Sequence, residues 1–213
     1  EYVDVCAATD PDGRALELFE QQQARVFDLE KAPLVRVLLV EQRRNRYLLG
    51  IVLHHIVADG WSIEVLIEEL CELYGSYYFR SAPKLRILAA RHRDLTSWLN
   101  ARKNHDDLAY WQAKLGGELP ILDLPTDKPR PAHKSYRGDV RVRSMDVRLV
   151  HALRTVASRY NVTLFMLLVA TVKVLLAKYS GQRDIVVGHP SAGRQHPAFE
   201  GQVGFFINTV VLR

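Results

Sequence analysis

The hydrophobic pattern changes its period along the first half of the chain. Two β-rich runs, 33–42 and 46–55, flank a short polar loop and predict a β-hairpin. From Trp61 onward the apolar residues recur about every 3.6 residues, which predicts a helix of about five turns. Upstream, 2–7 is expected to form a short strand and 11–27 a helix that starts at turn residues. One side of the long helix is apolar and carries Ile63, Leu66, Ile67, Leu70, Tyr74 and Tyr77.

The second half of the chain predicts helices and strands on either side of a proline-rich stretch. Proline blocks both helix and ladder pairing, so "ELPILDLPTDKPRPAHKS" is expected to be an extended crossing segment or linker. Nearly continuous apolar residues at 163–181 predict a buried helix that Gly181 closes. The fold class expected from this pattern is α/β, with a boundary in the proline-rich stretch. The other predicted elements are one or two helices over 91–117, an exposed strand at 136–147, an amphipathic helix at 148–162, and strands at 184–190 and 203–213.

Composition is that of a globular protein and narrows the classes of partner. The 213 residues are 48% hydrophobic and 25% charged, enough to bury a core as one large domain or two small ones. The net charge of +5 favours acidic partners. The basic clusters lack interleaved stacking aromatics, so they are typical of solvated faces or of a surface for an acidic protein. The longest apolar stretch is too short to span a bilayer and carries Lys173, so neither nucleic acid nor a membrane is expected as a partner.

The two cysteines and the ends of the chain add further expectations. Cys6 and Cys71 make neither a disulfide framework nor a metal cluster, which suits a reducing, cytoplasmic compartment. Cys71 falls close to the apolar side of the long helix and is expected to be an inert, buried thiol. The chain opens strand-like without Met and stops in or just after a strand, so a fragment of a larger protein is expected.

The main candidate chemistry lies in the stretch "LHHIVADGWS". His54 and His55 end a predicted strand, and successive strand residues face opposite sides, so only one of them can face a given cleft. In one interpretation the histidines are structural and Asp59 caps the helix that begins near Gly60. In the other, a histidine at the end of a rigid strand is a base, and Asp59 and Gly60 fix the turn that follows. Spacing alone favours neither interpretation.

Other motifs leave few alternatives. The histidine pair lacks the His-x-x-x-His spacing of helical zinc sites and has no cysteine near it, so no metal is expected. The sequence has no Gly-x-Ser-x-Gly elbow, no phosphate-binding loop and no dinucleotide-binding fingerprint, which disfavours three large enzyme classes. Asn208, in the middle of an apolar run, is either a hydrogen-bonded structural amide or a donor that faces a reaction cleft.

Several motifs, taken in order, resemble the condensation domains of nonribosomal peptide synthetases. "LHHIVADGWS" resembles the His-His-x-x-x-Asp-Gly signature of that family, and "FDLEKAPLVRVLLV" resembles the segment before it. "HRDLTSW" is similar to the next motif, with His92 where the family usually has tyrosine. "YWQAKLGG" and "LPTDKPRP" resemble the end of the first lobe and the crossing segment. "DIVVGHPSAGR" and "VGFFINTVVLR" resemble a motif of the second lobe with a Phe-x-Asn-Thr core, so the resemblance covers essentially the whole chain.

The resemblance implies an α/β fold like that of chloramphenicol acetyltransferase. Two such lobes form a V-shaped pseudo-dimer with a tunnel between them, and this chain is expected to cover it only in part. The implied domains are a first lobe at 1–119, truncated at its start, a crossing segment at 120–135 and the beginning of a second lobe at 136–213.

The implied reaction is amide-bond formation between a carrier-bound donor acyl thioester and the amine of a carrier-bound aminoacyl thioester. Both substrates are held on phosphopantetheine arms, so no cofactor is expected to bind directly. The implied partners are the two carrier proteins and neighbouring adenylation and carrier domains. His55 is implied as the base or a positioning group, His54 as structural, Asp59 as an organiser paired with an arginine, and Gly60 as a point of close backbone approach. The substrate tunnel or oxyanion site would include Asn208, Trp61 and Ser62.

Two other functions stay open beside this one. A stand-alone acyltransferase of the same superfamily would use a diffusible coenzyme A thioester, and a non-catalytic docking domain would keep the motif as structure. Within the family, the His-His pair disfavours a heterocyclisation domain, and "GWSIEVL" looks more like a condensation domain than an epimerisation domain.

Overall fold

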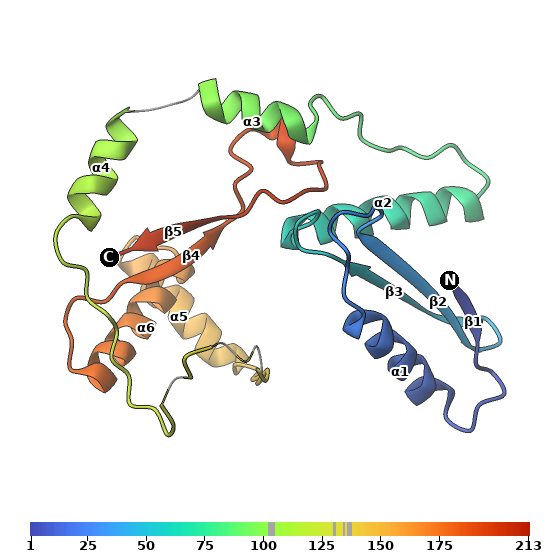
Figure 1. The fold of residues 1–213 in the computed structure, drawn as a ribbon, viewed down its shortest axis with the longest axis horizontal. Coiled ribbons are helices and arrows are strands. Elements are labelled where there is room, and N and C mark those ends of the chain that lie inside the picture. The colour runs from blue at the N-terminus through green and yellow to red at the C-terminus, as the bar shows by residue number, and fades with distance from the viewer. Residues whose placement is uncertain (102–104, 130, 134, 136–137) are drawn as a thin grey trace. The chain divides into compact units, whose positions relative to one another are not determined.

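The computed structural model describes residues 1–101, 105–129, 131–133, 135 and 138–213 (Figure 1). Its contacts divide the chain into two compact units. The first unit comprises Glu1–Lys103 and Ser191–Asn208, and the second comprises Asn104–Pro190 and Thr209–Arg213. A loop from near the end of the chain therefore packs with the first unit. The lobe boundaries expected at 119 and 135 concern the whole domain and stay a prediction.

A three-stranded sheet organises the beginning of the first unit. The central strand β2 (Val35–Arg43) pairs antiparallel with β3 (Arg46–Leu53) and parallel with β1 (Tyr2–Asp4). The predicted hairpin is confirmed. Asn45 takes a left-handed conformation (φ 63°) in its turn, which asparagine tolerates better than most residues.

Helix α1 (Pro11–Ala24) packs against this sheet (Figure 1). It begins at Asp10, whose carboxylate accepts a hydrogen bond from the Gly13 amide. Gly50 of β3 permits the close approach, because a Cβ there would lie 2.5 Å from the ring of Phe19. The core beneath the helix consists of Val5, Ala15, Leu38 and Val40.

Helix α2 (Gly60–Tyr78) follows the hairpin and confirms the predicted long helix. Its apolar side is largely exposed, and Tyr74 and Tyr77 have 72% and 89% of their surface in contact with solvent. Cys71 is also exposed, so the prediction of a buried thiol is wrong. The prediction failed because nothing among the described residues covers this part of the helix.

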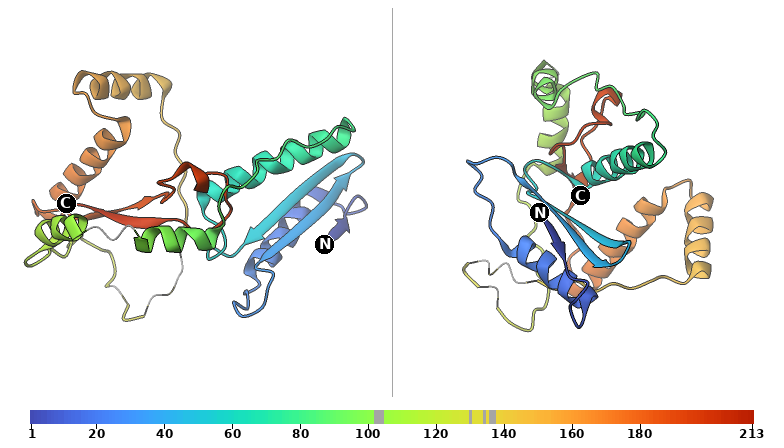
Figure 2. Two further views of the ribbon diagram at one scale, coloured as in Figure 1. Left: turned by 90° about the horizontal axis from the view of Figure 1, so that it is seen from above. Right: turned by 90° about the vertical axis from the view of Figure 1, so that its right-hand side faces the viewer.

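A second small core joins α3 (His92–Ala101) to the loop 191–208. Leu95, Phe199 and Phe206 are buried together, and Trp98 packs against them. Phe199 lies in a short 3₁₀ helix, Pro197–Phe199. Figures 1 and 2 both show the loop beside α3. The loop and α3 are thereby held together as one part of the first unit.

The second unit contains α4 (His105–Leu115), α5 (Val147–Arg159), α6 (Leu164–Ser180) and a sheet of β4 (Val187–Ser191) and β5 (Asn208–Leu212). Helix α6 begins after the N-cap Thr163 and ends at Gly181, whose φ of 72° confirms the predicted stop. The Lys173 ammonium donates to the Leu212 carbonyl (3.3 Å), which ties α6 to β5.

Three expectations for this part of the chain are wrong. The described residues 138–146 form no strand, because no neighbouring strand offers them ladder partners. Helix α6 has no buried residue, although its composition predicts a buried helix. Asn208 opens β5 instead of lying in its middle. Each error concerns the neighbours of an element, which local sequence does not encode.

No single helix within the described ranges is long and apolar enough to cross a membrane. Helices α5 and α6 meet that length and composition only when they are taken together, and they are bent by 100° relative to each other.

Candidate active site

The two histidines lie just beyond β3, in a turn that joins it to α2. The His54 amide donates to the Leu34 carbonyl (3.1 Å), and the Val57 amide donates to the His54 carbonyl (3.0 Å). Strand β3 ends at Leu53, so the expected alternation of strand faces does not apply to the pair. The turn instead leaves His54 half-buried and His55 exposed.

His54 is held by contacts on both sides of its ring. Its Nδ1 accepts a hydrogen bond from the Ile56 amide (3.1 Å), and its ring meets Phe27 edge to face (5.9 Å between centroids). The guanidinium of Arg36 lies 3.7 Å from the centre of the Phe27 ring and donates to carbonyls at the end of α1. These are the contacts of a structural support, and they leave Nε2 to carry the proton of the neutral ring.

Asp59 is the buried centre of the site. It caps α2 by accepting from the Ser62 amide (2.9 Å), and its side chain has no exposed surface. It also accepts from the Ser62 hydroxyl (2.8 Å) and the Phe206 amide (3.0 Å). Arg194 donates to both carboxylate oxygens, at 2.8 and 3.0 Å. The arginine partner implied for Asp59 is therefore present, and it comes from the loop 191–208.

The electrostatics of this pair keep Asp59 ionised. Burial alone would raise the pKa of the Asp59 carboxyl, but hydrogen bonds from Arg194, Ser62 and Phe206 outweigh it and hold that pKa well below its usual range. The Arg194 side chain is itself only 2% exposed and stacks over the Phe206 ring at 4.2 Å. A carboxylate with this many donors and no exposed surface organises the loop and cannot contact a substrate in this arrangement.

Two of the expected tunnel residues bind this same loop. The Ser62 hydroxyl is fully buried, and besides Asp59 it lies 3.0 Å from the Gly204 amide and 3.1 Å from an Arg194 nitrogen. The Trp61 indole donates to the Glu200 carbonyl (2.8 Å), while 41% of that residue stays exposed. Ser62 is thus occupied by structural contacts, and the tunnel role of Trp61 stays a prediction.

Gly60 and Asn208 have less constrained surroundings than expected. A Cβ at Gly60 would meet no described atom within 4 Å, so the packing of this chain does not require glycine there. Close approach of a bound substrate to Gly60 stays a prediction. Asn208 is exposed at the first position of β5, so burial of its amide does not arise in this chain, and its donor role also stays a prediction.

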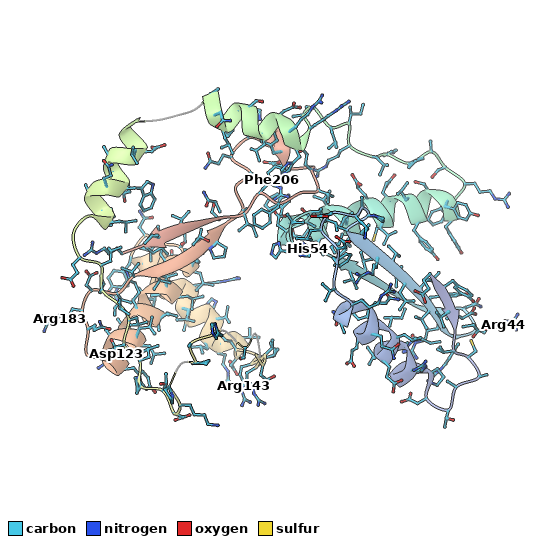
Figure 3. The ribbon with its side chains drawn as sticks, in the orientation of Figure 1. Arg44, His54, Asp123, Arg143, Arg183 and Phe206 are labelled. Carbon is cyan, nitrogen blue, oxygen red and sulfur yellow. The ribbon has the colours of Figure 1, made fainter. Side chains whose placement is uncertain are left out.

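His55 contacts the loop through one aromatic residue. Its ring meets Phe205 edge to face, with 5.3 Å between centroids and 78° between planes. Within the described part of the chain, no hydrogen bond to its ring nitrogens is formed. Figure 3 shows the neighbouring His54 and Phe206, both near the N-terminal end of α2. An exposed imidazole with unoccupied nitrogens can accept a proton from an incoming group.

Sequence reasoning did not assign roles to Arg194 or Phe205. The signal for Arg194 was available, since a buried aspartate needs a charged or multiply donating partner. The signal for its position was not, because the partner lies 135 residues from Asp59. The turn that brings it back includes Gly193 (φ 69°), where a Cβ would lie only 1.9 Å from the Phe206 carbonyl oxygen.

Among the described residues, no group of three or more His, Cys, Asp or Glu side chains could hold a metal ion. The chemistry available at the site is therefore that of an exposed imidazole beside a buried ion pair.

Comparison with known proteins places this geometry in a family context. A family model described as "Condensation domain" matches residues 1–213. One chain of the linear gramicidin synthase from Brevibacillus parabrevis is 41% identical over 211 residues, which are 97% of this chain and 3% of that protein.

Two solved structures resemble the fold. The first condensation domain of the CDA synthetase gives a TM-score of 0.77 at 23% identity, over 100% of this chain and 48% of that one. The epimerization domain from the third module of tyrocidine synthetase B gives 0.85 at 23% identity, over 99% of this chain and 50% of that one. The predicted fold class is confirmed, and it does not separate condensation from epimerization domains.

Proposed function

The chain belongs to the condensation-domain family of nonribosomal peptide synthetases, and from that premise we propose that it is part of a domain that joins two carrier-bound substrates through an amide bond. The chain spans about half of the solved domains it resembles and 3% of the gramicidin synthase chain. The activity is therefore proposed for the longer protein. The observation that supports it best is the exposed His55 imidazole, held beside a buried Asp59–Arg194 pair.

In the proposed reaction, the amine of the acceptor attacks the thioester carbonyl of the donor. A C–N bond forms, the C–S bond breaks, and the thiol of the donor's carrier leaves with a proton. A free α-amino group has a pKa of about 8 and is partly protonated near neutral pH, so a neutral imidazole at His55 can take the proton that the amine loses. Alignment of the two reacting ends supplies much of the rate enhancement, because it makes the attack effectively intramolecular.

Asp59 and Arg194 have a supporting role in this proposal. Their ion pair is buried and joins the start of α2 to the loop 191–208. It therefore sets where His55 stands relative to that loop without touching the reacting atoms. His54, fixed by Phe27 and Ile56, supports the same turn from the other side.

The proposed partners follow from the family. Donor and acceptor carrier proteins would present their substrates on phosphopantetheine arms, and adenylation domains would neighbour this one in the same synthetase. A four-domain nonribosomal peptide synthetase is among the solved structures that resemble this chain, at 25% identity. A cytoplasmic location stays a prediction that rests on the sequence.

The decisive experiment replaces His55 with alanine in the full-length parent protein. Product formation from carrier-bound donor and acceptor should fall strongly, while His151→Ala, at an exposed histidine of α5, should leave it unchanged. A wild-type rate in His55→Ala would contradict the catalytic assignment and favour a docking domain. Supplying the donor as a coenzyme A thioester tests the other alternative, because a stand-alone acyltransferase would accept it without a carrier protein.

A further inference from the structure

Phe205 is the described residue whose side chain contacts the exposed His55 ring. We propose that Phe205 is a positioning residue, which holds the His55 imidazole in the orientation that receives the proton of the acceptor amine. This inference rests on the proposed function of His55. It goes beyond that function because it names what orients the base and how the buried ion pair reaches it.

The His55 ring needs an external constraint. It lies in a turn, is exposed, and has no hydrogen bond to its ring nitrogens within the described part of the chain. An exposed side chain of this kind exchanges between rotamers within nanoseconds. The edge-to-face contact with Phe205 is a preferred geometry for two aromatic rings, so it favours one of these rotamers.

The backbone around Phe205 is fixed on three consecutive residues. The Gly204 amide donates to the Ser62 hydroxyl (3.0 Å), and the Phe206 amide donates to Asp59 (3.0 Å). Between them, the Phe205 carbonyl lies 3.3 Å from the Nε2 of His92. Because Gly204 and Phe206 bind residues of the first turn of α2 or its cap, the position of Phe205 is set by the same helix end that follows His55.

The alternation of side chains along this segment separates two tasks. Phe206 points into the core with Leu95 and Phe199 and is 6% exposed. Its neighbour Phe205 points to the opposite side and is 44% exposed. Phe206 therefore anchors the segment, and Phe205 is free to present its ring to His55. Burial of Phe205 contributes little to the core, so its replacement should test position more than stability.

The chain of contacts gives the buried pair a route to the reacting atoms. Arg194 fixes Asp59, Asp59 holds the Phe206 amide, and the adjoining Phe205 ring meets His55. Gly204 is needed along this route, because a Cβ there would lie 2.6 Å from the His92 ring. Loosening any of these contacts should misplace the imidazole without removing it.

The test compares four variants of the full-length parent: Phe205→Ala, Phe205→Tyr, His55→Ala and the control Val203→Ala, a partly exposed residue of the same loop. Rates are measured over pH with carrier-bound substrates. Phe205→Ala should lower kcat by about tenfold with little change in KM, since misplacing a catalytic group mainly affects the reacting geometry. Phe205→Tyr should restore most of the rate because it keeps the ring.

A second readout does not depend on turnover. The rate at which diethyl pyrocarbonate modifies His55, mapped by mass spectrometry of the intact protein, should rise in Phe205→Ala because the ring is no longer covered on that side. It should stay at the wild-type value in Phe205→Tyr and Val203→Ala. The same measurement reports on Phe205 even where a variant is too slow to assay.

The outcomes separate the two proposals. If His55→Ala retains the wild-type rate, the proposed function fails, whatever Phe205 does. If His55→Ala loses activity while Phe205→Ala keeps both its kcat and its His55 modification rate, the positioning role is wrong. A rise in KM alone in Phe205→Ala would also overturn it, because that result describes a binding surface.

Discussion

Replacing Arg194 with methionine would leave the Asp59 carboxylate buried without its cationic partner. The methionine keeps much of the aliphatic volume but removes four hydrogen bonds, to the two Asp59 oxygens, the Ser62 hydroxyl and the Gln202 carbonyl. Asp59 would retain the donors of Ser62 and Phe206 only. Removing one partner of a buried ion pair typically costs about 3–5 kcal/mol, so the free energy of unfolding of this domain should fall by that amount.

The measurement is a urea titration of the intact parent protein, followed by hydrogen exchange of peptides from the loop 191–208 and the start of α2. With a urea dependence of about 2 kcal/mol per molar, the midpoint for these peptides should fall by about 2 M. Arg148→Met is the matched control, because Arg148 is 96% exposed beside Asp146 and should leave the midpoint unchanged.

The pH dependence gives this prediction a sign that packing loss would not reproduce. The folded-state pKa of Asp59 is depressed, so its contribution to stability is present above the unfolded value of about 3.9 and is lost as the pH falls further. In Arg194→Met, burial of the uncompensated carboxyl raises that pKa, so the variant gains stability in acid relative to neutral pH. The stability difference between wild type and variant should therefore be largest near pH 7 and shrink below about pH 5. A difference that is small at neutral pH, or that does not change with pH, would refute the reasoning.

The remaining predictions concern backbone conformation and capping, and thermal unfolding checks both. Gly193→Ala should destabilise the domain by more than about 2 kcal/mol, because φ is 69° and the added Cβ would meet the Phe206 carbonyl, whereas Gly75→Ala inside α2 should stabilise it by up to about 1 kcal/mol; equal effects of the two would contradict this account. Thr163→Ala should cost about 1 kcal/mol, since its hydroxyl caps α6 by accepting from the Met166 amide at 3.1 Å, and Thr163→Ser should recover most of the loss.

Much of the secondary structure was predictable because its causes are local. The hairpin, the long helix α2 and the stop at Gly181 depend on periodicity, capping and turn chemistry within a few residues. Asp59 was identified both as a helix cap and as a member of the candidate site, and the structure gives it the capping role together with a buried ion pair.

Burial was predicted less well, because it depends on what covers an element. The apolar sides of α2 and α6 are exposed in this chain, and Cys71 is exposed with them. The segment 138–146 has the alternation of a strand but no partner in its part of the fold. A hydrophobic pattern states that a face is suited to burial, and only the surrounding structure supplies the cover.

By itself, the sequence determined the elements, the order of the motifs and the pair of histidines before α2. Only the tertiary structure decided that Arg194 would be the partner of Asp59 and that Phe205 would lie against His55. Both contacts join the turn before α2 to a loop more than 130 residues later in the chain. Contacts at that separation depend on loop closure and on a shared core with α3, and no local preference of either segment encodes them.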